Sequence, residues 1–153
     1  MKKYLTTSFK QTQKLGENFA KEILLSRTLQ NATVLCLRGN LGGGKTTFLQ
    51  GFAKGLGIKE KILSPTFVIS KRFVIPAKAG IQIPFKNFYH IDCYRLNKPQ
   101  DILELGWQEI ISNPKNIIAI EWSEKIKKLL PKSIIEIDFK FIDEKTREIS
   151  FKM

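Results

Sequence analysis

A glycine-rich pattern constrains the fold of this chain more than any other feature. Residues 39–46, Gly-Asn-Leu-Gly-Gly-Gly-Lys-Thr, match G-x-x-x-x-G-K-[ST] in full. Glycines let the backbone curl so that several N–H groups point toward phosphate oxygens, where a β-carbon would block the approach. A β-branched apolar run, Thr33 to Leu37, precedes the pattern, and apolar residues recur at helical spacing from Lys45 to Leu56. The sequence therefore predicts a buried strand, a phosphate-binding loop and a helix in immediate succession.

The residue types in the loop point to a nucleoside triphosphate with Mg²⁺. Lys45 is expected to neutralise the β- and γ-phosphates, and Thr46 to offer its hydroxyl to Mg²⁺. The helix that begins at Lys45 adds its positive end. A plain glycine-rich turn would need neither the strand before it nor the helix after it. The glycines expected near the phosphates are Gly39, Gly42, Gly43 and Gly44.

Phosphoryl transfer also needs a carboxylate near Mg²⁺ and a group that positions the attacking water. Glu121 ends the apolar run IIAI, and Asp92 lies in the strand-like stretch HIDCYR. The alternatives are an ordinary strand-terminal acid for Glu121 and a salt bridge to Arg95 for Asp92. Thr66, just after Ser64-Pro65, is a candidate for contacting the γ-phosphate as switch threonines do, although a simple turn residue fits nearly as well.

The remaining apolar patterns predict a mixed α/β protein. Ser133 to Phe141 and Thr146 to Lys152 alternate apolar and polar residues, which predicts a terminal hairpin with one exposed face. Prolines and a glycine interrupt residues 76–84 between two strand-like runs, which predicts a hairpin with an enlarged tip. No repeat or linker divides the chain, so residues 1–153 are expected to form a single domain. The other predicted elements are helices over Gln13–Leu25 (beginning near Thr12), Lys45–Leu56 and Pro99–Asn113, and strands over Thr66–Ile75, Asn87–Arg95 and Ile117–Ile120.

Composition limits the classes of function. The 153 residues carry 26 Lys and Arg against 14 Asp and Glu, a formal net charge of +12, which suits a polyanionic partner or simply a solvated surface. Cys36 and Cys93 lie in apolar runs, which predicts buried thiols and excludes a disulfide scaffold. The lone His90 cannot build a multi-histidine metal site. No stretch has the length of a signal-peptide core or a membrane span. We therefore expect a cytoplasmic protein that does not enter a membrane.

The motifs that the sequence lacks limit which nucleotide base the protein can recognise and which reaction it can catalyse. The segment Asn97-Lys98-Pro99-Gln100 resembles N-K-x-D but lacks the aspartate that recognises guanine, so ATP is favoured over GTP. Two alternatives to an ATPase stay open. One is a small-molecule P-loop kinase, which needs an acceptor pocket and an arginine-rich lid. The other is a non-catalytic binding module gated by nucleotide, in which Asp92 and Glu121 would be structural.

Five motifs occur in an order that resembles a known family: GNLGGGKTT at 39–47, SPTF at 64–67, HIDCYRL at 90–96, LELG at 103–106 and IEWS at 120–123. Together they resemble TsaE, the small ATPase of bacterial tRNA threonylcarbamoyladenosine biosynthesis. The resemblance implies a three-layer P-loop NTPase-like α/β fold with a mixed parallel and antiparallel sheet, and Mg²⁺-dependent ATP hydrolysis. It also implies action on a complex of the subunits TsaD and TsaB, which modifies adenosine 37 of tRNAs reading codons that begin with A. The basic surface would then meet this complex or its tRNA.

The resemblance assigns roles to single residues. It implies that Glu121 is a further Mg²⁺ ligand beside Thr46, that Asp92 lies beside the nucleotide with a role in hydrolysis, and that Trp122 is close enough to report nucleotide occupancy. The candidate catalytic residues are then Lys45, Thr66, Asp92 and Glu121. The residues implied at the nucleotide are Gly39, Gly42, Gly43, Gly44, Lys45, Thr46, Thr47, Asp92, Trp122 and Arg147, with the segments 9–12 and 145–147 approaching it.

Two departures from the family pattern carry expectations of their own. Gly43 stands where the family usually has alanine, which should loosen the loop slightly through added backbone entropy without removing an N–H. The stretch 73–86, FVIPAKAGIQIPFK, is longer than the family's hairpin connection and is expected to be an inserted surface loop, exposed and mobile. Each doubling of a loop's length costs only about 0.6 kcal/mol. ATP binding should therefore survive deletion of Pro76 to Pro84.

Overall fold

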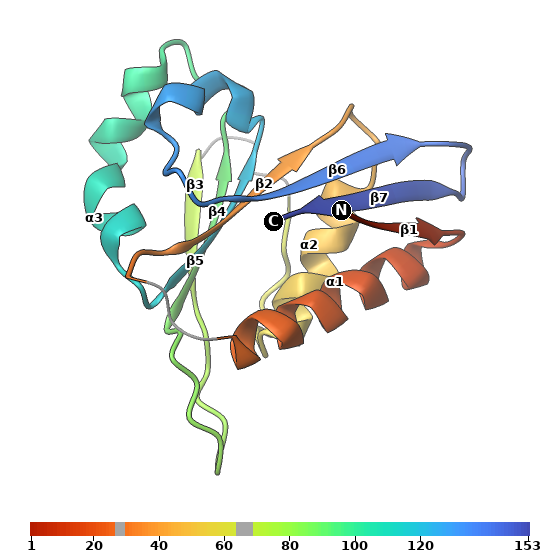
Figure 1. The fold of residues 1–153 in the computed structure, drawn as a ribbon, viewed down its shortest axis with the longest axis horizontal. Helices are drawn as coiled ribbons and strands as arrows, with labels where there is room; N and C mark the ends of the chain where they lie inside the picture. Colours follow the sequence, from red (N-terminus) through yellow and green to blue (C-terminus); the bar gives the residue numbers. More distant parts are fainter. Residues whose placement is uncertain (27–29, 64–68) are drawn as a thin grey trace.

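A mixed seven-stranded sheet forms the centre of the protein in the computed structural model, which describes residues 1–26, 30–63 and 69–153 (Figure 1). The strand order is β1-β7-β6-β2-β5-β4-β3. Neighbours among β6, β2, β5 and β4 are parallel, whereas β7 pairs antiparallel with β6 and β1, and β3 with β4. The predicted mixed α/β fold is confirmed. The strands are β1 (Lys2–Thr6), β2 (Thr33–Arg38), β3 (Ser70–Val74), β4 (Asn87–Asp92), β5 (Asn116–Glu121), β6 (Ile135–Phe141) and β7 (Arg147–Lys152).

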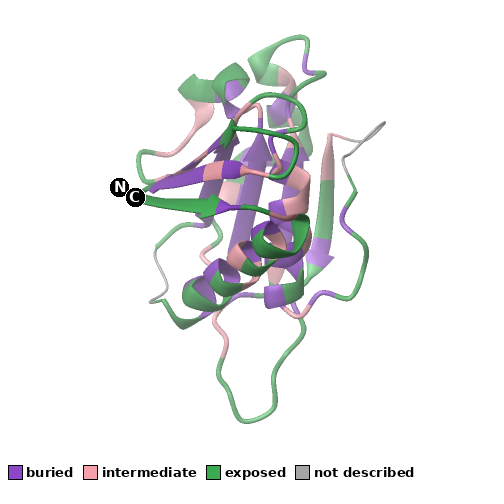
Figure 2. Cartoon of the chain, turned by 90° about the vertical axis from the view of Figure 1, so that its right-hand side faces the viewer, coloured by how far each residue is buried: buried purple, intermediate pink, exposed green. Residues whose placement is uncertain are grey.

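Helices cover both faces of this sheet and make the three layers. The alternation of side chains along β2 shows why: Leu35 and Leu37 pack toward α1 and α2, while Val34 and Cys36 pack toward the opposite helical layer. Because both faces of β2 are buried, its residues from Val34 to Leu37 are all apolar, as the sequence predicts. Figure 2 shows the buried strands between helices whose outer faces are exposed. The helices are α1 (Phe9–Leu25), α2 (Lys45–Gly55), η1 (Pro99–Leu105), α3 (Trp107–Ser112) and η2 (Ser123–Leu129).

The ends of three parallel strands meet at one edge of the sheet. Leu37 of β2 lies opposite Glu121 of β5, and Glu121 lies opposite Asp92 of β4. The loop that follows β2 therefore begins beside Glu121, and Asp92 lies one strand further along the same edge. In open α/β sheets this carboxyl edge is where ligands bind.

Glycines bring α1 and α2 into close contact. A β-carbon at Gly51 would lie 1.8 Å from the Gln13 carbonyl oxygen, and one at Gly16 would lie 2.2 Å from the Phe48 carbonyl oxygen. No larger residue fits at either position unless a helix moves. The close crossing holds the first turn of α1 beside the glycine loop that precedes α2.

The N-terminal segment differs from its prediction in two respects. The helix begins at Phe9 and not near Thr12, because the Ser8 hydroxyl caps it by accepting a hydrogen bond from the Gln11 N–H at 3.2 Å. The strand β1 was not predicted at all. It lies at the edge of the sheet with most of its side chains exposed, so it has no apolar alternation for a sequence pattern to detect.

The β3–β4 hairpin agrees with the predicted hairpin and corrects its limits. The strand β4 ends at Asp92 and not at Arg95, because the Asp92 carboxylate accepts the Tyr94 N–H at 2.9 Å and turns the chain. Val74 pairs with Asn87, so the connection spans 75–86 and projects from the body of the protein (Figures 1 and 2). Residues 76–82 are exposed, but Phe73, Ile75 and Phe85 are buried at its base. Part of the stretch 73–86 therefore belongs to the core.

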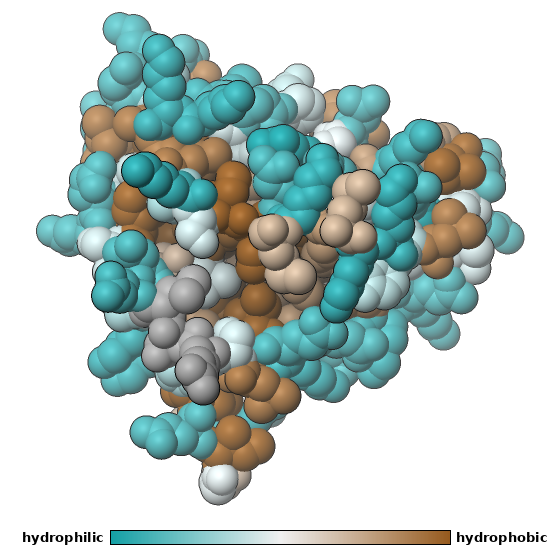
Figure 3. Space-filling view, in the orientation of Figure 1, coloured by the Kyte–Doolittle hydropathy of each residue, from teal (hydrophilic) through white to brown (hydrophobic). Residues whose placement is uncertain are grey.

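The surface matches the charged composition. Figure 3 shows hydrophilic side chains over most of one face, with apolar side chains gathered toward its middle. Within the described part of the chain, no helix is both long enough and apolar enough to span a membrane.

Candidate nucleotide-binding site

The loop between β2 and α2 adopts a backbone that glycine permits. Gly42 and Gly44 have φ angles of +76° and +96°, in the left-handed region that other residues rarely adopt. Gly39, at φ +141°, lies so close to β6 that a β-carbon would stand 2.5 Å from the Phe139 carbonyl oxygen. Gly44 is also the N-cap of α2, so the loop leads directly into the positive end of that helix.

Gly43 has a steric role that its sequence context did not reveal. Its N–H donates to the Asn40 carbonyl oxygen at 3.0 Å, and a β-carbon here would lie 2.9 Å from the same oxygen. Alanine at position 43 would therefore have to shift the loop backbone. Added backbone entropy is not the whole difference between glycine and alanine at this position.

Lys45 is buried at the first turn of α2. Its ammonium donates to the carbonyl oxygens of Gly39 and Asn40 and lies 5.2 Å from the centre of the Trp122 ring. Burial lowers the pKa of the Lys45 ammonium, while the nearby carboxylates of Glu121 and Asp92 oppose that shift. The loop thus holds a positive charge over its own carbonyls and beside two acids.

The two acids occupy adjacent strand ends with different surroundings. Glu121 is buried, and its Oε2 lies 2.8 Å from the Nε2 of His90, which is also buried. Asp92 is partly exposed, and burial raises the pKa of its carboxyl, with a further rise from Glu121, while the hydrogen bond from the Tyr94 N–H lowers it. One acid is therefore held by a histidine and the other is held by the backbone.

Trp122 follows Glu121 in a strained conformation. It has φ +57° and ψ +41°, the left-handed region, which costs a bulky residue of order 1–3 kcal/mol. Its ring packs against Tyr94 at 5.1 Å between centroids and faces the Lys45 ammonium. Such strain is typical of residues held in place at functional sites.

Most of the residues described above line one pocket of about 340 Å³, although His90 and Tyr94 do not. Gly39 is not among the lining residues, but its carbonyl anchors Lys45. Thr66 and the rest of the SPTF motif lie outside the residues that the structure describes. The lining residues are Phe9, Leu41, Gly42, Gly43, Gly44, Lys45, Thr46, Thr47, Asp92, Glu121, Trp122 and Arg147.

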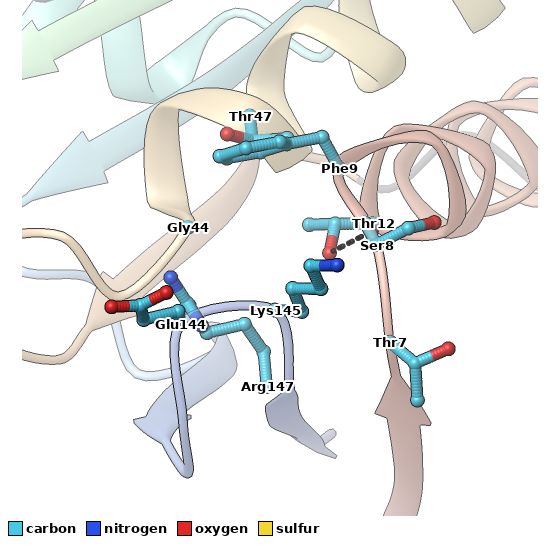
Figure 4. A pocket seen from close by; sticks show the side chains of 9 residues that line it. All are labelled: Thr7, Ser8, Phe9, Thr12, Gly44, Thr47, Glu144, Lys145 and Arg147. Carbon is cyan, nitrogen blue, oxygen red and sulfur yellow. Dashed lines mark hydrogen bonds between the residues drawn. The ribbon is translucent and has the colours of Figure 1, made fainter.

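A second pocket of about 320 Å³ adjoins the first and shares Phe9, Gly44, Thr47 and Arg147 with it. Its other wall residues come from the start of α1 and from the turn between β6 and β7. Figure 4 shows the Phe9 side chain beside Thr47 on one side and the side chains of this turn on the other. The remaining lining residues are Thr7, Ser8, Thr12, Glu144 and Lys145.

Arg147 is fixed between the two pockets. It is buried, its Nη1 donates to the Asp143 and Thr146 carbonyl oxygens at 2.6 and 2.9 Å, and its Cζ lies 4.6 Å from the Phe141 ring centre. Its Nε is also buried and has no hydrogen-bond partner among the described residues. A buried donor without a partner is costly unless a ligand or water satisfies it.

The donor set fits a phosphate chain with Mg²⁺. Oxygen ligands suit this hard cation, and the pocket offers the Thr46 hydroxyl with the carboxylates of Glu121 and Asp92. The loop glycines leave open the space that β-carbons would fill, and Lys45 supplies positive charge.

Comparison with known proteins identifies the family. The family model described as threonylcarbamoyl adenosine biosynthesis protein TsaE matches residues 6–149. The match includes the glycine loop, both acids and most of the terminal hairpin. The chain belongs to the TsaE family.

Individual TsaE proteins match most of the chain. The "tRNA threonylcarbamoyladenosine biosynthesis protein TsaE" of Rickettsia typhi is 37% identical over 142 residues, covering 92% of this chain and 90% of the relative. The proteins of the same name from a Nostoc species and from Haemophilus influenzae are 42% and 34% identical, over 82% and 86% of this chain and 74% and 77% of their own lengths. The crystal structure of YdiB from Bacillus subtilis has a TM-score of 0.72 and 30% identity, covering 98% of this chain and 83% of that one.

Several residues at the two pockets carry little or no signal in the sequence. Thr7 and Ser8 were not singled out, although Ser8 followed by Gln11 is a helix N-terminal signal that would have placed Phe9 in the first turn. Glu144 and Leu41 had no signal of their own. His90 is a lone histidine and predicts no metal site, but it stands two residues before Asp92, which puts both side chains on one face of β4.

Proposed function

We propose that the protein is a Mg²⁺-dependent ATPase required for threonylcarbamoylation of adenosine 37 in tRNAs that read codons beginning with A, and that it acts on a TsaB–TsaD complex in the cytoplasm. The observation that carries the proposal is the single pocket in which the glycine loop, buried Lys45 and two strand-end carboxylates converge in a TsaE-family chain. The TsaE names of the relatives support the tRNA modification, and the net charge of +12 supports contact with the complex or its tRNA.

The residues around the glycine loop have distinct roles in this proposal. The loop N–H groups and the positive end of α2 bind the phosphates, and Lys45 exchanges its carbonyl partners for phosphate oxygens. Thr46 and Glu121 hold Mg²⁺, which when bound neutralises charge that develops on the phosphates. Asp92 is the candidate to orient the attacking water, because it is partly exposed and its raised pKa brings its basicity closer to neutral pH.

The second pocket is the proposed binding site for the adenosine part of ATP. It adjoins the phosphate loop through Gly44 and Thr47, and Phe9 provides an aromatic wall against which a base can pack. Arg147 and Lys145 lie on the opposite side from Phe9 (Figure 4). The buried Nε of Arg147 would gain a hydrogen-bond partner from the bound nucleotide.

The test is ATP hydrolysis by the purified protein with Mg²⁺, alone and with TsaB, TsaD and tRNA. We expect slow turnover alone, an increase with the partners, and loss of turnover in a Lys45→Ala control. Stimulation by a small-molecule acceptor, with no effect of the partners, would instead indicate a kinase. Unchanged turnover in both Asp92→Ala and Glu121→Ala would show that neither acid is catalytic.

A further inference from the structure

His90 is a buried polar side chain to which the proposed chemistry assigns no role. Its side chain is 1% exposed, and its Nε2 lies 2.8 Å from Oε2 of Glu121, whose side chain is 6% exposed. A carboxylate in such surroundings is costly unless a partner donates to it. The protein therefore places a histidine where it can donate to the acid that is the proposed Mg²⁺ ligand.

The sheet fixes this pair from both sides. His90 lies opposite Ala119 in the parallel pairing of β4 with β5, and Glu121 is two residues further along β5 on the same face. On its other side, β5 pairs with β2, which leads into the glycine loop. Neither backbone can shift without breaking the ladder that carries the loop.

The hydrogen bond engages one of the two carboxylate oxygens of Glu121. Oε2 is held by His90, while the residue also lines the pocket that contains Lys45, Thr46 and Asp92. A carboxylate with one oxygen held is restricted in its side-chain torsions, so its free oxygen keeps a fixed direction. Residues that hold metal ligands in this way typically change metal affinity by about 10- to 100-fold when they are removed.

We propose that His90 is a positioning residue, donating from Nε2 to one oxygen of Glu121 and thereby directing the other oxygen toward Mg²⁺. The proposal rests on the proposed function, because it takes Glu121 as a Mg²⁺ ligand. His90 touches neither nucleotide nor metal in this arrangement and acts only through Glu121.

The test separates donation by Nε2 from simple filling of space. In His90→Gln the amide nitrogen replaces the imidazole Nε2 and keeps a donor within reach of Glu121. In His90→Leu no donor remains, and in His90→Asn the amide nitrogen corresponds to the imidazole Nδ1 and falls short of Glu121. The asparagine variant keeps a polar group and serves if the leucine variant does not fold.

Metal affinity is measured directly, without turnover. Each protein is first titrated with ADP in EDTA by calorimetry, and Mn²⁺ binding to the ADP complex is then measured by electron paramagnetic resonance. We expect ADP affinity in EDTA to stay within about twofold in every variant, because the glycine loop is untouched. Mn²⁺ affinity should fall by about 10- to 100-fold in His90→Leu and His90→Asn and recover to within about threefold in His90→Gln.

Replacing the Glu121 carboxylate by an amide provides the decisive control. In a Glu121→Gln background, His90→Leu should have no further effect on Mn²⁺ affinity, because effects that run through one shared partner are not additive. Wild-type Mn²⁺ affinity in His90→Leu and His90→Asn overturns the proposal, as does equal loss in all three variants or an additive loss in the double mutant. Failure of the wild-type protein to bind ADP would instead contradict the proposed function.

Discussion

At the scale of single residues, Asp92 combines a proposed role in hydrolysis with a charge that does not stabilise the fold. Burial raises the pKa of the Asp92 carboxyl, because the folded protein stabilises the ionised form less than water does. The folded protein therefore binds the Asp92 proton more tightly than the unfolded chain does. The resulting stabilisation is fully present below the unfolded-state pKa and is lost as pH rises through the folded-state pKa. At neutral pH the charge therefore destabilises the fold, as is common where a carboxylate serves chemistry.

We predict that Asp92→Asn separates activity from stability. The amide oxygen can still accept the Tyr94 N–H, but it cannot act as a base, so ATP turnover should fall by about 10²- to 10⁴-fold. The thermal midpoint should rise relative to wild type at pH 7 to 8, and the gain should shrink as pH falls into the range where aspartate is protonated. Turnover assays and thermal unfolding across pH measure the two effects.

Asp143 is a matched control for the pH dependence. It lies in the exposed β6–β7 turn, where hydrogen bonds from the backbone N–H of Lys145 and from Thr146 lower its carboxyl pKa. Asp143→Asn should therefore lower the thermal midpoint at neutral pH, the opposite sign to Asp92→Asn. The same sign in both variants would show that burial does not govern the behaviour of Asp92.

At the scale of secondary-structure elements, the crossing of α1 and α2 shapes the second pocket, which lies between the start of α1 and the β6–β7 turn. Gly16 and Gly51 let the two backbones approach more closely than side chains allow. The crossing fixes Phe9 at the start of α1 beside Thr47 in the first turns of α2 (Figure 4). The second pocket therefore depends on a helix contact as well as on the residues that line it.

We predict that Gly51→Ala destabilises the protein by about 1–3 kcal/mol or more, because the added methyl group meets the Gln13 carbonyl oxygen. Nucleotide affinity should fall as well, since α2 carries Lys45 and Thr46. Urea unfolding and ADP titration measure both effects. Lys54→Ala, an exposed change on the same helix, should alter stability by no more than about 0.5 kcal/mol. Equal stability of the two variants would mean that the helices separate easily.

At the scale of the whole molecule, the 75–86 connection projects from the body of the protein (Figure 1). The tip, residues 76–82, is exposed, and an isolated backbone bridge pairs Lys78 with Ile81. The base is different, because Ile75 donates to the Lys86 carbonyl oxygen at 2.8 Å and both Ile75 and Phe85 are buried. No residue of the 75–86 connection lines the candidate nucleotide pocket.

We predict that replacing Pro76–Pro84 by a short Asn-Gly turn leaves ADP affinity within about twofold of wild type and changes stability by no more than about 1 kcal/mol. The reason is that Ile75 and Phe85, which are buried in the core, are kept, and that of the replaced residues only Ile83 packs against the core. Calorimetric titration and urea unfolding check the two quantities. Loss of nucleotide binding in a folded variant would show that the tip contributes to the site.

Local pattern alone specified part of the site. The strand β2, the glycine loop and α2 were predictable because their signals, an apolar run, four glycines and helical spacing, lie within one short segment. Glu121 was predictable from its place after an apolar strand. The register that sets Asp92 opposite Glu121, and His90 within hydrogen-bonding distance of it, could not be read from either strand alone.

The sequence by itself determined that this protein has a glycine-rich loop between a buried strand and a helix, because glycine conformation and hydrophobic periodicity act over neighbouring residues. Only the tertiary structure decided which distant residues complete the site. The strand order brings β4 beside β5, the α1–α2 crossing places Phe9, and the terminal hairpin delivers Arg147. These contacts depend on which apolar faces are buried together, and burial is settled by the whole chain at once.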